Sequence, residues 1–375
     1  MQNIHVPLYT IRHSQIGGTE FWIYNLLRGL VGAGARVDMH YGRDADLSRD
    51  FLDWAGMEDH VELHREGALP GPKNVRFAEE FLFQQRRRGD QDWTLFPNYF
   101  CPPNLLSRRR KNAVVLHDIQ YRCLPEYHSK KRRQWLDFYL PKMFKTADSV
   151  ILISHSEWNL VRENFGEDAA SRCTVVHSPI DFERLEQPAV RASDSVLEMV
   201  KHPYILSVCH QFPHKNVATL LKAFERIATG NPSLRLYLVG SASEANLAFI
   251  QNSLSPAVRG RVHITGFVSD AELGQFYANA RLFVMPSLYE GFGMPAIEAL
   301  GLGVPTLVSK AFALPEVTLG YAGLIDRPRE VEPWAEAMEA ALAAGVRPTA
   351  EQVKHIRDTY HPTTTGREVL AVLRP

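Results

Sequence analysis

The stretch RLFVMPSLYEGFGMPAIEALGLGVPTLVS, from Arg281 to Ser309, decides the fold. Its two ends, "RLFVMPS" and "VPTLVS", are short apolar runs typical of buried strands. Between them, Pro295 suits the first turn of a helix that we expect to end near Leu300. Strand, helix and strand in this order predict a βαβ unit with parallel strands.

The same alternation extends from this stretch back toward the N-terminus. A later series of apolar runs contains "YILSVCHQ", "LRLYLVG" and "RVHITGFV", and an earlier series contains "IHVPLYT", "ARVDMHYG", "NAVVLHD", "SVILIS" and "CTVVHS". Residues 180–202 lack strong patterns and predict a linker. We therefore predict an α/β protein with two Rossmann-like domains. Ligands of such sheets bind at the carboxyl ends of the strands.

Composition narrows the class of protein. The 375 residues carry a formal net charge of +0, so no global field favours nucleic acid as a partner. No apolar run approaches the roughly 20 residues that span a bilayer, and the N-terminus lacks a signal-peptide pattern. Four scattered cysteines form no CxxC pair, which predicts reduced thiols and no zinc site. We expect a cytoplasmic protein.

Charge is concentrated in one segment despite the neutral total. Residues 84–145 contain 14 Lys or Arg and five Asp or Glu, a net charge of +9. The cations include Lys130, Lys131, Arg132 and Arg133. This segment is either a set of solvated surfaces or a patch for anionic lipid or a pyrophosphate-bearing acceptor.

Three further motifs place ligand-binding residue types at expected strand ends. "QIGGTE" puts Gly17 and Gly18 before a helix, where backbone N–H groups can approach a phosphate. "VVLHD" ends a strand with His117. "PHKN" puts Lys215 before a helix with Asn216 as its N-cap, and a lysine at this end of a helix favours a bound anion.

Glu290 and Glu298 lie eight positions apart within the deciding stretch. They could flank one bond as an acid and a base, or contact two points of one elongated ligand. Their spacing in sequence does not distinguish these readings.

The block "EGFGMPAIEALGLGVPTLVS" resembles the E-x7-E signature of retaining glycosyltransferases of family 4, which have the GT-B fold. The glycine pair, His117, "PHKN" and "LPEV" follow in that family's order, so the resemblance covers nearly the whole chain. It implies an acceptor-binding domain at 1–182, a donor-binding domain at 183–358 and a segment at 359–375 that crosses back to the first domain.

The resemblance also implies a role for each matching residue. Glu290, with Phe292, Gly293 and Met294 beside it, is expected to hold the donor sugar, and Glu298 the ribose. His117 is expected to contact the sugar near the reacting centre. The remaining donor contacts are expected at the diphosphate, from Gly17, Gly18, His210 and Lys215, and at the base, from Phe267 and Val268.

One departure concerns the diphosphate. Many members of the family carry an arginine five or six positions before the lysine, where this chain has Cys209 and His210. Either His210 donates to the phosphates or another cation replaces the arginine. The triplets at 44–46 and 90–92 resemble metal-binding DxD motifs but sit in polar loops, so we expect neither a metal nor a cofactor.

The sequence therefore predicts a retaining, metal-independent hexosyltransferase, with mannose from GDP-mannose as the favoured donor and a glycan or lipid-linked glycan as the acceptor. Peripheral contact with the inner face of the cytoplasmic membrane fits the basic segment. The alternatives are a rhamnosyl- or glucosyltransferase, a nucleotide-sugar epimerase of the same fold, and a non-catalytic nucleotide-sugar-binding protein. A Rossmann dehydrogenase is disfavoured because the first strand–helix turn lacks GxGxxG.

Overall fold

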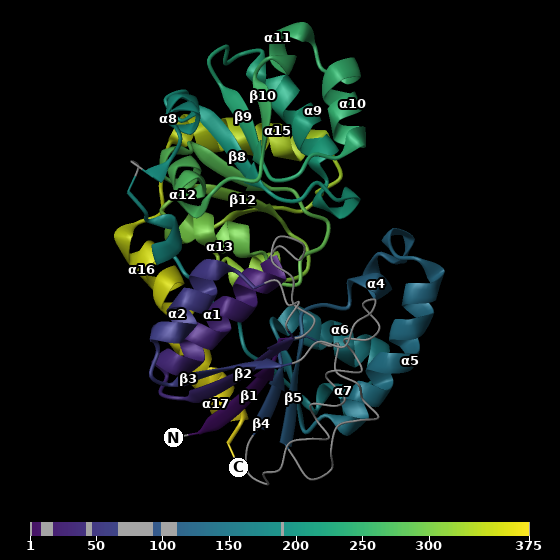
Figure 1. The fold of residues 1–375 in the computed structure, drawn as a ribbon. Helices are drawn as coiled ribbons and strands as arrows, with labels where there is room; N and C mark the ends of the chain where they lie inside the picture. Colours follow the sequence, from purple (N-terminus) through teal and green to yellow (C-terminus); the bar gives the residue numbers. More distant parts are fainter. Residues whose placement is uncertain are drawn as a thin grey trace. The chain divides into compact units, whose positions relative to one another are not determined.

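The computed structural model describes residues 2–8, 18–42, 47–66, 93–98, 111–188 and 191–374. The chain divides into two compact units (Figure 1). Unit 1 comprises Met1–Pro179 and Tyr360–Pro375, and unit 2 comprises Ile180–Thr359. The first division lies three residues before the boundary expected after residue 182, and the second lies one residue after residue 358.

The described part of unit 1 contains a seven-stranded parallel sheet in the order β3-β2-β1-β4-β5-β6-β7. Its strands are β1 (Asn3–Pro7), β2 (Arg36–Gly42), β3 (Val61–Glu66), β4 (Trp93–Phe96), β5 (Lys111–Leu116), β6 (Ser149–Leu152) and β7 (Cys173–Val175). The strand order reverses between β1 and β4, which is the point of a doubly wound sheet where ligands bind.

Helices cover this sheet and are drawn around it in Figure 1. They are α1 (Gly18–Gly32), α2 (Arg49–Met57), α4 (Gln120–Cys123), η1 (Pro125–Tyr127), α5 (Lys130–Thr146), α6 (His155–Phe165), α7 (Glu167–Ala170) and α17 (Pro362–Val372). The apolar side of α5 packs into one buried cluster with β5 and β6, through Leu140, Met143 and Phe144.

Helix α17, near the end of the chain, packs against α1, near its beginning. A Cβ atom added to Gly29 of α1 would lie 2.1 Å from the carbonyl oxygen of Pro362, so the two backbones touch at a glycine. His361 caps the helix by accepting from the N–H of Thr363 at 3.2 Å. The helical chain thus breaks between α16 (Ala350–Thr359) and α17, which begins at Pro362.

Unit 2 contains a six-stranded parallel sheet in the order β10-β9-β8-β11-β12-β13. Its strands are β8 (Tyr204–Val208), β9 (Arg235–Val239), β10 (Val262–Gly266), β11 (Leu282–Met285), β12 (Thr306–Ser309) and β13 (Gly323–Ile325). The order reverses between β8 and β11. The strands on either side of Glu290, β11 and β12, are parallel neighbours, as the deciding stretch predicts.

The helices of unit 2 alternate with these strands. They are η2 (Glu183–Leu185), α8 (Asp194–Met199), η4 (Pro213–Lys215), α9 (Val217–Ala228), α10 (Glu244–Ser253), α11 (Pro256–Arg259), α12 (Asp270–Asn279), α13 (Met294–Gly301), α14 (Leu314–Val317), α15 (Val331–Ala344) and α16 (Ala350–Thr359). Helix α9 buries apolar residues at helical spacing, among them Leu220, Phe224 and Ile227, and α15 adds Trp334 to the same cluster.

Candidate functional site

Two loops of unit 2 meet where its strand order reverses. Strands β8 and β11 are direct neighbours, with Ile205 opposite Leu282, and each is followed by one of the loops. The N–H of Leu288 in the β11 loop donates to the carbonyl oxygen of His214 in the β8 loop at 2.7 Å. This bond fixes the two loops side by side at the carboxyl edge of the sheet.

Lys215 from the first loop and Glu290 from the second form an ion pair. The distance from Lys215 Nζ to Glu290 Oε1 is 2.7 Å, and the side chains are only 17% and 11% exposed. The structure thus brings together a cation that can bind a phosphate and a carboxylate that can accept from hydroxyl groups. Sequence reasoning named both residues but not their contact.

Asn216 holds Lys215 in place in a way that the sequence did not predict. It occupies the N-cap position of α9, but its side chain accepts no bond from the helix N–H groups. Instead, its amide donates to the carbonyl oxygens of Pro286 and Pro328 at 3.1 and 2.7 Å. Asn216 is therefore the N-cap residue of α9, as predicted, but its side chain ties the end of η4 to the loop after β11 instead of bonding the helix N–H groups.

Gly293 shapes the loop that carries Glu290. Its φ of +99° lies in the left-handed region, and a Cβ atom there would lie 2.6 Å from Leu314 Cδ2. Helix α13 then begins at Met294 with Pro295 in its first turn, as predicted. Phe292 is buried under the loop.

Glu298 lies one turn into α13, in a buried network. Its side chain accepts from the Tyr277 hydroxyl at Oε2 over 2.8 Å and forms an ion pair with Arg184 at Oε1. Glu298 is only 3% exposed. Arg184 and Tyr277 have no local sequence signal as site residues, because their partners lie far along the chain.

His210 stands at the position where the resemblance predicts an arginine, and its surroundings favour the neutral imidazole. Its Nδ1 lies 3.1 Å from the hydroxyl oxygen of Ser241. Burial, and then the charge of Lys215, lower the pKa of His210. Burial raises the pKa of the neighbouring Cys209 thiol to about 11, so it stays protonated at neutral pH. Neither residue adds a positive charge beside Lys215.

Phe267 and Val268 follow β10, and Phe267 is 71% exposed. The Phe267 ring lies 5.3 Å from the His210 ring, and the ring of Phe212, two residues along the same loop as His210, lies 6.0 Å from it. The three rings form an exposed aromatic surface beside the Lys215–Glu290 pair, of the kind on which a nucleobase can stack.

In unit 1, His117 follows β5 and is held on two sides. Its Nε2 donates to the carbonyl oxygen of Pro97 at 2.9 Å, and the edge of the ring packs against Trp22 at 4.5 Å. Burial lowers the pKa of His117, so the imidazole is neutral and its Nδ1 is the acceptor. Buried Glu157 supports the following loop by accepting from the N–H of Ile119 at 3.0 Å. Sequence reasoning missed this role of Glu157.

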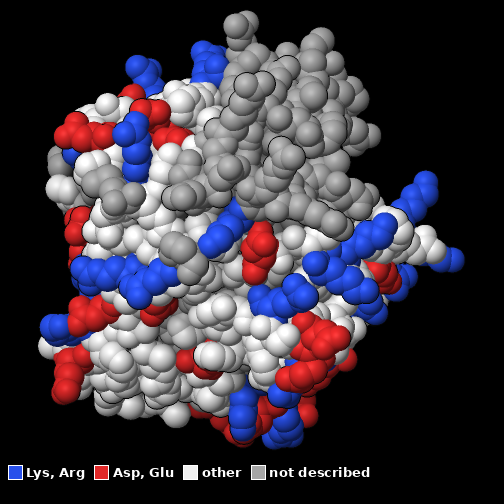
Figure 2. All heavy atoms as spheres, turned by 90° about the horizontal axis from the view of Figure 1, so that it is seen from below, with Lys and Arg blue, Asp and Glu red and all other residues white. Residues whose placement is uncertain are grey.

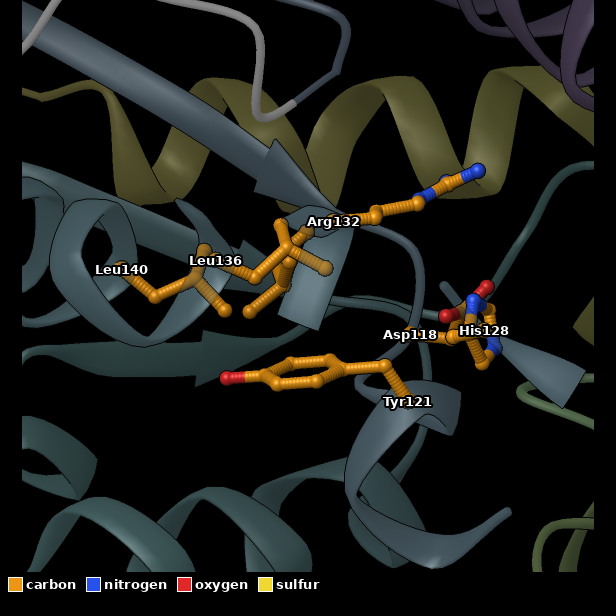
Figure 3. A pocket seen from close by; sticks show the side chains of 7 residues that line it. Asp118, Tyr121, His128, Arg132, Leu136 and Leu140 are labelled. Carbon is orange, nitrogen blue, oxygen red and sulfur yellow. The ribbon is translucent and has the colours of Figure 1, made fainter. Parts of the chain in front are cut away.

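A small pocket lies beside this loop (Figure 3). Asp118 and His128 lie together at one end, and the Tyr121 ring, Leu136 and Leu140 line the other. Its volume is about 10 Å³, room for a single water molecule and not for a sugar. Asp118 accepts from the N–H of Gln120, the first residue of α4, at 3.1 Å.

The basic residues Lys130–Arg133 form the first turn of α5. Four cations at a helix N-terminus oppose the helix dipole. The same helix exposes 64% of Phe138, with Lys142 Nζ 3.6 Å from its ring centre. On the face in Figure 2, Lys and Arg mix with Asp and Glu over the described surface.

Several predicted features lie outside the described residues, namely Gly17 and the triplets at 44–46 and 90–92. Gly18 is the first residue of α1. Within the described residues, one group of Asp38, Glu62 and His64 has ligand atoms within 4.8 Å of one another. Arg36 already pairs with both carboxylates there, which disfavours a second cation. No helix in the described part combines the length and apolarity of a bilayer span.

Both units have the parallel-sheet α/β architecture found in solved structures of the GT-B fold. Two family descriptions match consecutive parts of the chain, Glycosyltransferase Family 4 over residues 16–184 and Glycosyl transferases group 1 over residues 192–356. The chain belongs to this family of glycosyltransferases.

Known proteins resemble the chain in sequence and in fold. O-antigen chain mannosyltransferase B of Escherichia coli is 30% identical over 247 residues, which are 63% of this chain and 61% of that protein. Sucrose-phosphate synthase from Thermosynechococcus elongatus has a TM-score of 0.76 at 18% identity and covers 99% of this chain and 98% of its own. Anabaena HepE, solved in complex with UDP-glucose, has a TM-score of 0.71 at 18% identity. The match covers 100% of this chain and 99% of the HepE chain. These structures share the fold.

Proposed function

We propose that the protein transfers a hexose, with mannose from GDP-mannose as the first choice, to a glycan or lipid-linked glycan in polysaccharide or O-antigen synthesis. The transfer retains the anomeric configuration and needs no metal. The choice of mannose is supported by the 30% identity to an O-antigen chain mannosyltransferase. A nucleotide-sugar donor is supported by the likeness to HepE, which was solved with UDP-glucose.

The Lys215–Glu290 pair carries the proposal. Departure of a nucleoside diphosphate leaves negative charge, and a preorganised cation at a largely water-excluded site stabilises it. Lys215 is such a cation, with Nζ 2.7 Å from Glu290 Oε1. When a donor binds, Lys215 turns to its phosphates, and Glu290 accepts from hydroxyl groups of the sugar next to them. One lysine in a rigid loop thereby takes the place that a metal has in other glycosyltransferases.

The remaining donor contacts follow from the exposed surface around this pair. Phe267 and Val268 lie where the base would pack, and neutral His210 can donate one hydrogen bond to a phosphate. The backbone around Gly293 lets the sugar approach the start of α13. The assignment of His117 to the sugar stays a prediction.

Helix α5 supports contact with an anionic membrane surface. Its first-turn cations oppose the helix dipole unless an anion lies nearby, and Phe138 exposes an aromatic ring on the same helix. Reversal of all four charges at 130–133 should reduce binding to vesicles that contain anionic lipid at low salt. Unchanged binding would leave α5 as an ordinary solvated surface.

A thermal-shift panel of UDP-, GDP- and dTDP-sugars tests the function without knowledge of the acceptor. A donor that binds only the folded state raises the melting temperature, and at 100 times its Kd the stabilisation is about 2.7 kcal/mol. We expect GDP-mannose to give the largest shift. A larger shift with another nucleotide sugar would identify that sugar as the preferred donor. No shift with any nucleotide sugar would contradict the proposed function.

A further inference from the structure

Three separate elements of unit 2 converge on the carboxylate of Glu298. Glu298 comes from α13, Tyr277 from α12, and Arg184 from η2, within the predicted linker segment 180–202. Tyr277 donates to Oε2 at 2.8 Å, Arg184 pairs with Oε1 through one guanidinium nitrogen, and its other terminal nitrogen pairs with Asp270 at the start of α12. One arginine thus joins two carboxylates on two helices.

Close packing fixes the position of Arg184. A Cβ atom added to Gly274 of α12 would lie 1.8 Å from the carbonyl oxygen of Leu185, and one added to Gly301 of α13 would lie 2.1 Å from the Phe182 ring. The segment from Phe182 to Leu185 is therefore seated against both helices through glycines. Arg184 has little freedom to leave its two carboxylates.

At neutral pH the Tyr277 hydroxyl in this network stays protonated and the Arg184 guanidinium stays charged. Burial and the adjacent Glu298 carboxylate raise the pKa of Tyr277, so its hydroxyl remains a hydrogen-bond donor. Burial lowers the pKa of Arg184, but the carboxylates of Glu298 and Asp270 raise it by more than burial lowers it. The guanidinium therefore stays charged. The cation offsets the cost of a buried carboxylate.

Each oxygen of Glu298 accepts one bond and retains a second lone pair. Two adjacent hydroxyl groups of a ligand could therefore donate one hydrogen bond to each Glu298 oxygen, while Arg184 and Tyr277 keep their own bonds to the same oxygens. A carboxylate clamped at both oxygens presents a fixed pair of acceptors, whereas an unclamped side chain would have to be ordered at each binding event.

On the basis of the proposed function, we propose that Arg184 and Tyr277 are positioning residues that aim the Glu298 carboxylate at the 2′,3′-diol of the donor ribose. Arg184 is then a determinant of specificity for ribonucleotides. A purely structural role would predict weaker binding of every nucleotide in equal proportion when Arg184 is replaced. The positioning role predicts loss of discrimination between nucleotides with and without the diol.

Calorimetry with GDP and UDP, and with their 2′,3′-dideoxy counterparts, separates these cases. Wild type should bind the better ribonucleotide at least about tenfold more tightly than its dideoxy form, since hydrogen bonds to a charged group are lost. Arg184→Met should reduce this ratio to within about twofold, and Arg184→Lys should keep part of it. Asp270→Asn, which removes only the more exposed partner of Arg184, should leave the ratio as in wild type.

Tyr277→Phe provides a second test if Arg184→Met does not fold. It removes one hydroxyl group and should lower the ratio by several-fold with little change in shape. A ratio that stays at the wild-type value in both Arg184→Met and Tyr277→Phe would overturn the inference and leave the proposed function intact. Wild type that binds no nucleoside diphosphate would overturn both, and wild type that binds both forms equally would overturn the inference alone.

Discussion

Lys215 is the residue on which binding of the diphosphate depends most. Its replacement by Ala should weaken binding of free GDP or UDP by roughly 10- to 100-fold, the usual loss for a hydrogen bond between charged groups. Lys222→Ala is the matched control, because Lys222 is an exposed lysine on α9, close along the chain. Equal affinities of the Lys215 and Lys222 variants in calorimetry would exclude Lys215 from the diphosphate site.

His210 predicts a dependence of binding on pH. Its pKa is lowered by burial and by Lys215, so it is neutral at pH 7.5. A bound diphosphate favours the charged imidazole, so binding takes up a proton and affinity should rise as the pH falls to about 6.

His210→Gln is the control for this pH effect, because the amide cannot take up a proton. It should retain only the smaller change that comes from the phosphates themselves. Identical pH profiles of wild type and His210→Gln, measured by calorimetry from pH 6 to 7.5, would show that the imidazole stays neutral in the complex.

Local sequence patterns identified single residues but not their long-range partners. Lys215 and Glu290 stand out because each lies at a strand end in a recognisable loop, yet their contact spans 75 positions. Arg184 lies within the predicted linker and has no pattern of its own, although it pairs with Glu298. Such partners depend on how helices pack and are visible only in three dimensions.

At the scale of elements, α17 joins unit 1 through a contact that tolerates no side chain. Gly29→Ala would place a methyl group 2.1 Å from the Pro362 carbonyl oxygen, so we expect a loss of about 1–3 kcal/mol in stability. Hydrogen exchange of the α17 amides should accelerate accordingly. Gly56→Ala on α2 is the control, because nothing lies within 4 Å of its added methyl group. Equal exchange in the two variants would contradict close packing of α17 on α1.

The elements that the sequence predicted best are long or continuously apolar. Helices α1 and α9 show helical spacing of apolar residues, β11 is apolar throughout, and β8 is apolar except for Ser207. Three strands of the described residues were missed. Strand β3 alternates with charged residues in "VELHRE", and β4 and β13 have only four and three residues. Pairing with neighbouring strands stabilises such segments, and a local pattern cannot show it.

At the scale of the whole molecule, the two units repeat one architecture with different site chemistry. Each has a parallel sheet whose order reverses beside its first strand. Unit 2 places Lys215, Glu290 and the exposed ring of Phe267 at this edge, which supports its assignment to the donor. The basic start of α5 supports the proposed assignment of unit 1 to the acceptor, whereas neutral His117 is proposed to contact the donor sugar.

In the proposed site, Glu290 binds the sugar of the donor and Lys215 binds its diphosphate. Titration of wild type and Glu290→Gln with GDP and GDP-mannose, or with the best pair from the donor panel, tests this central claim most directly. Glu290→Gln should bind the free nucleotide as tightly as wild type or more tightly, because Lys215 loses its partner, and should bind the nucleotide sugar about tenfold less tightly. Equal weakening of both ligands, or of neither, would contradict the claim.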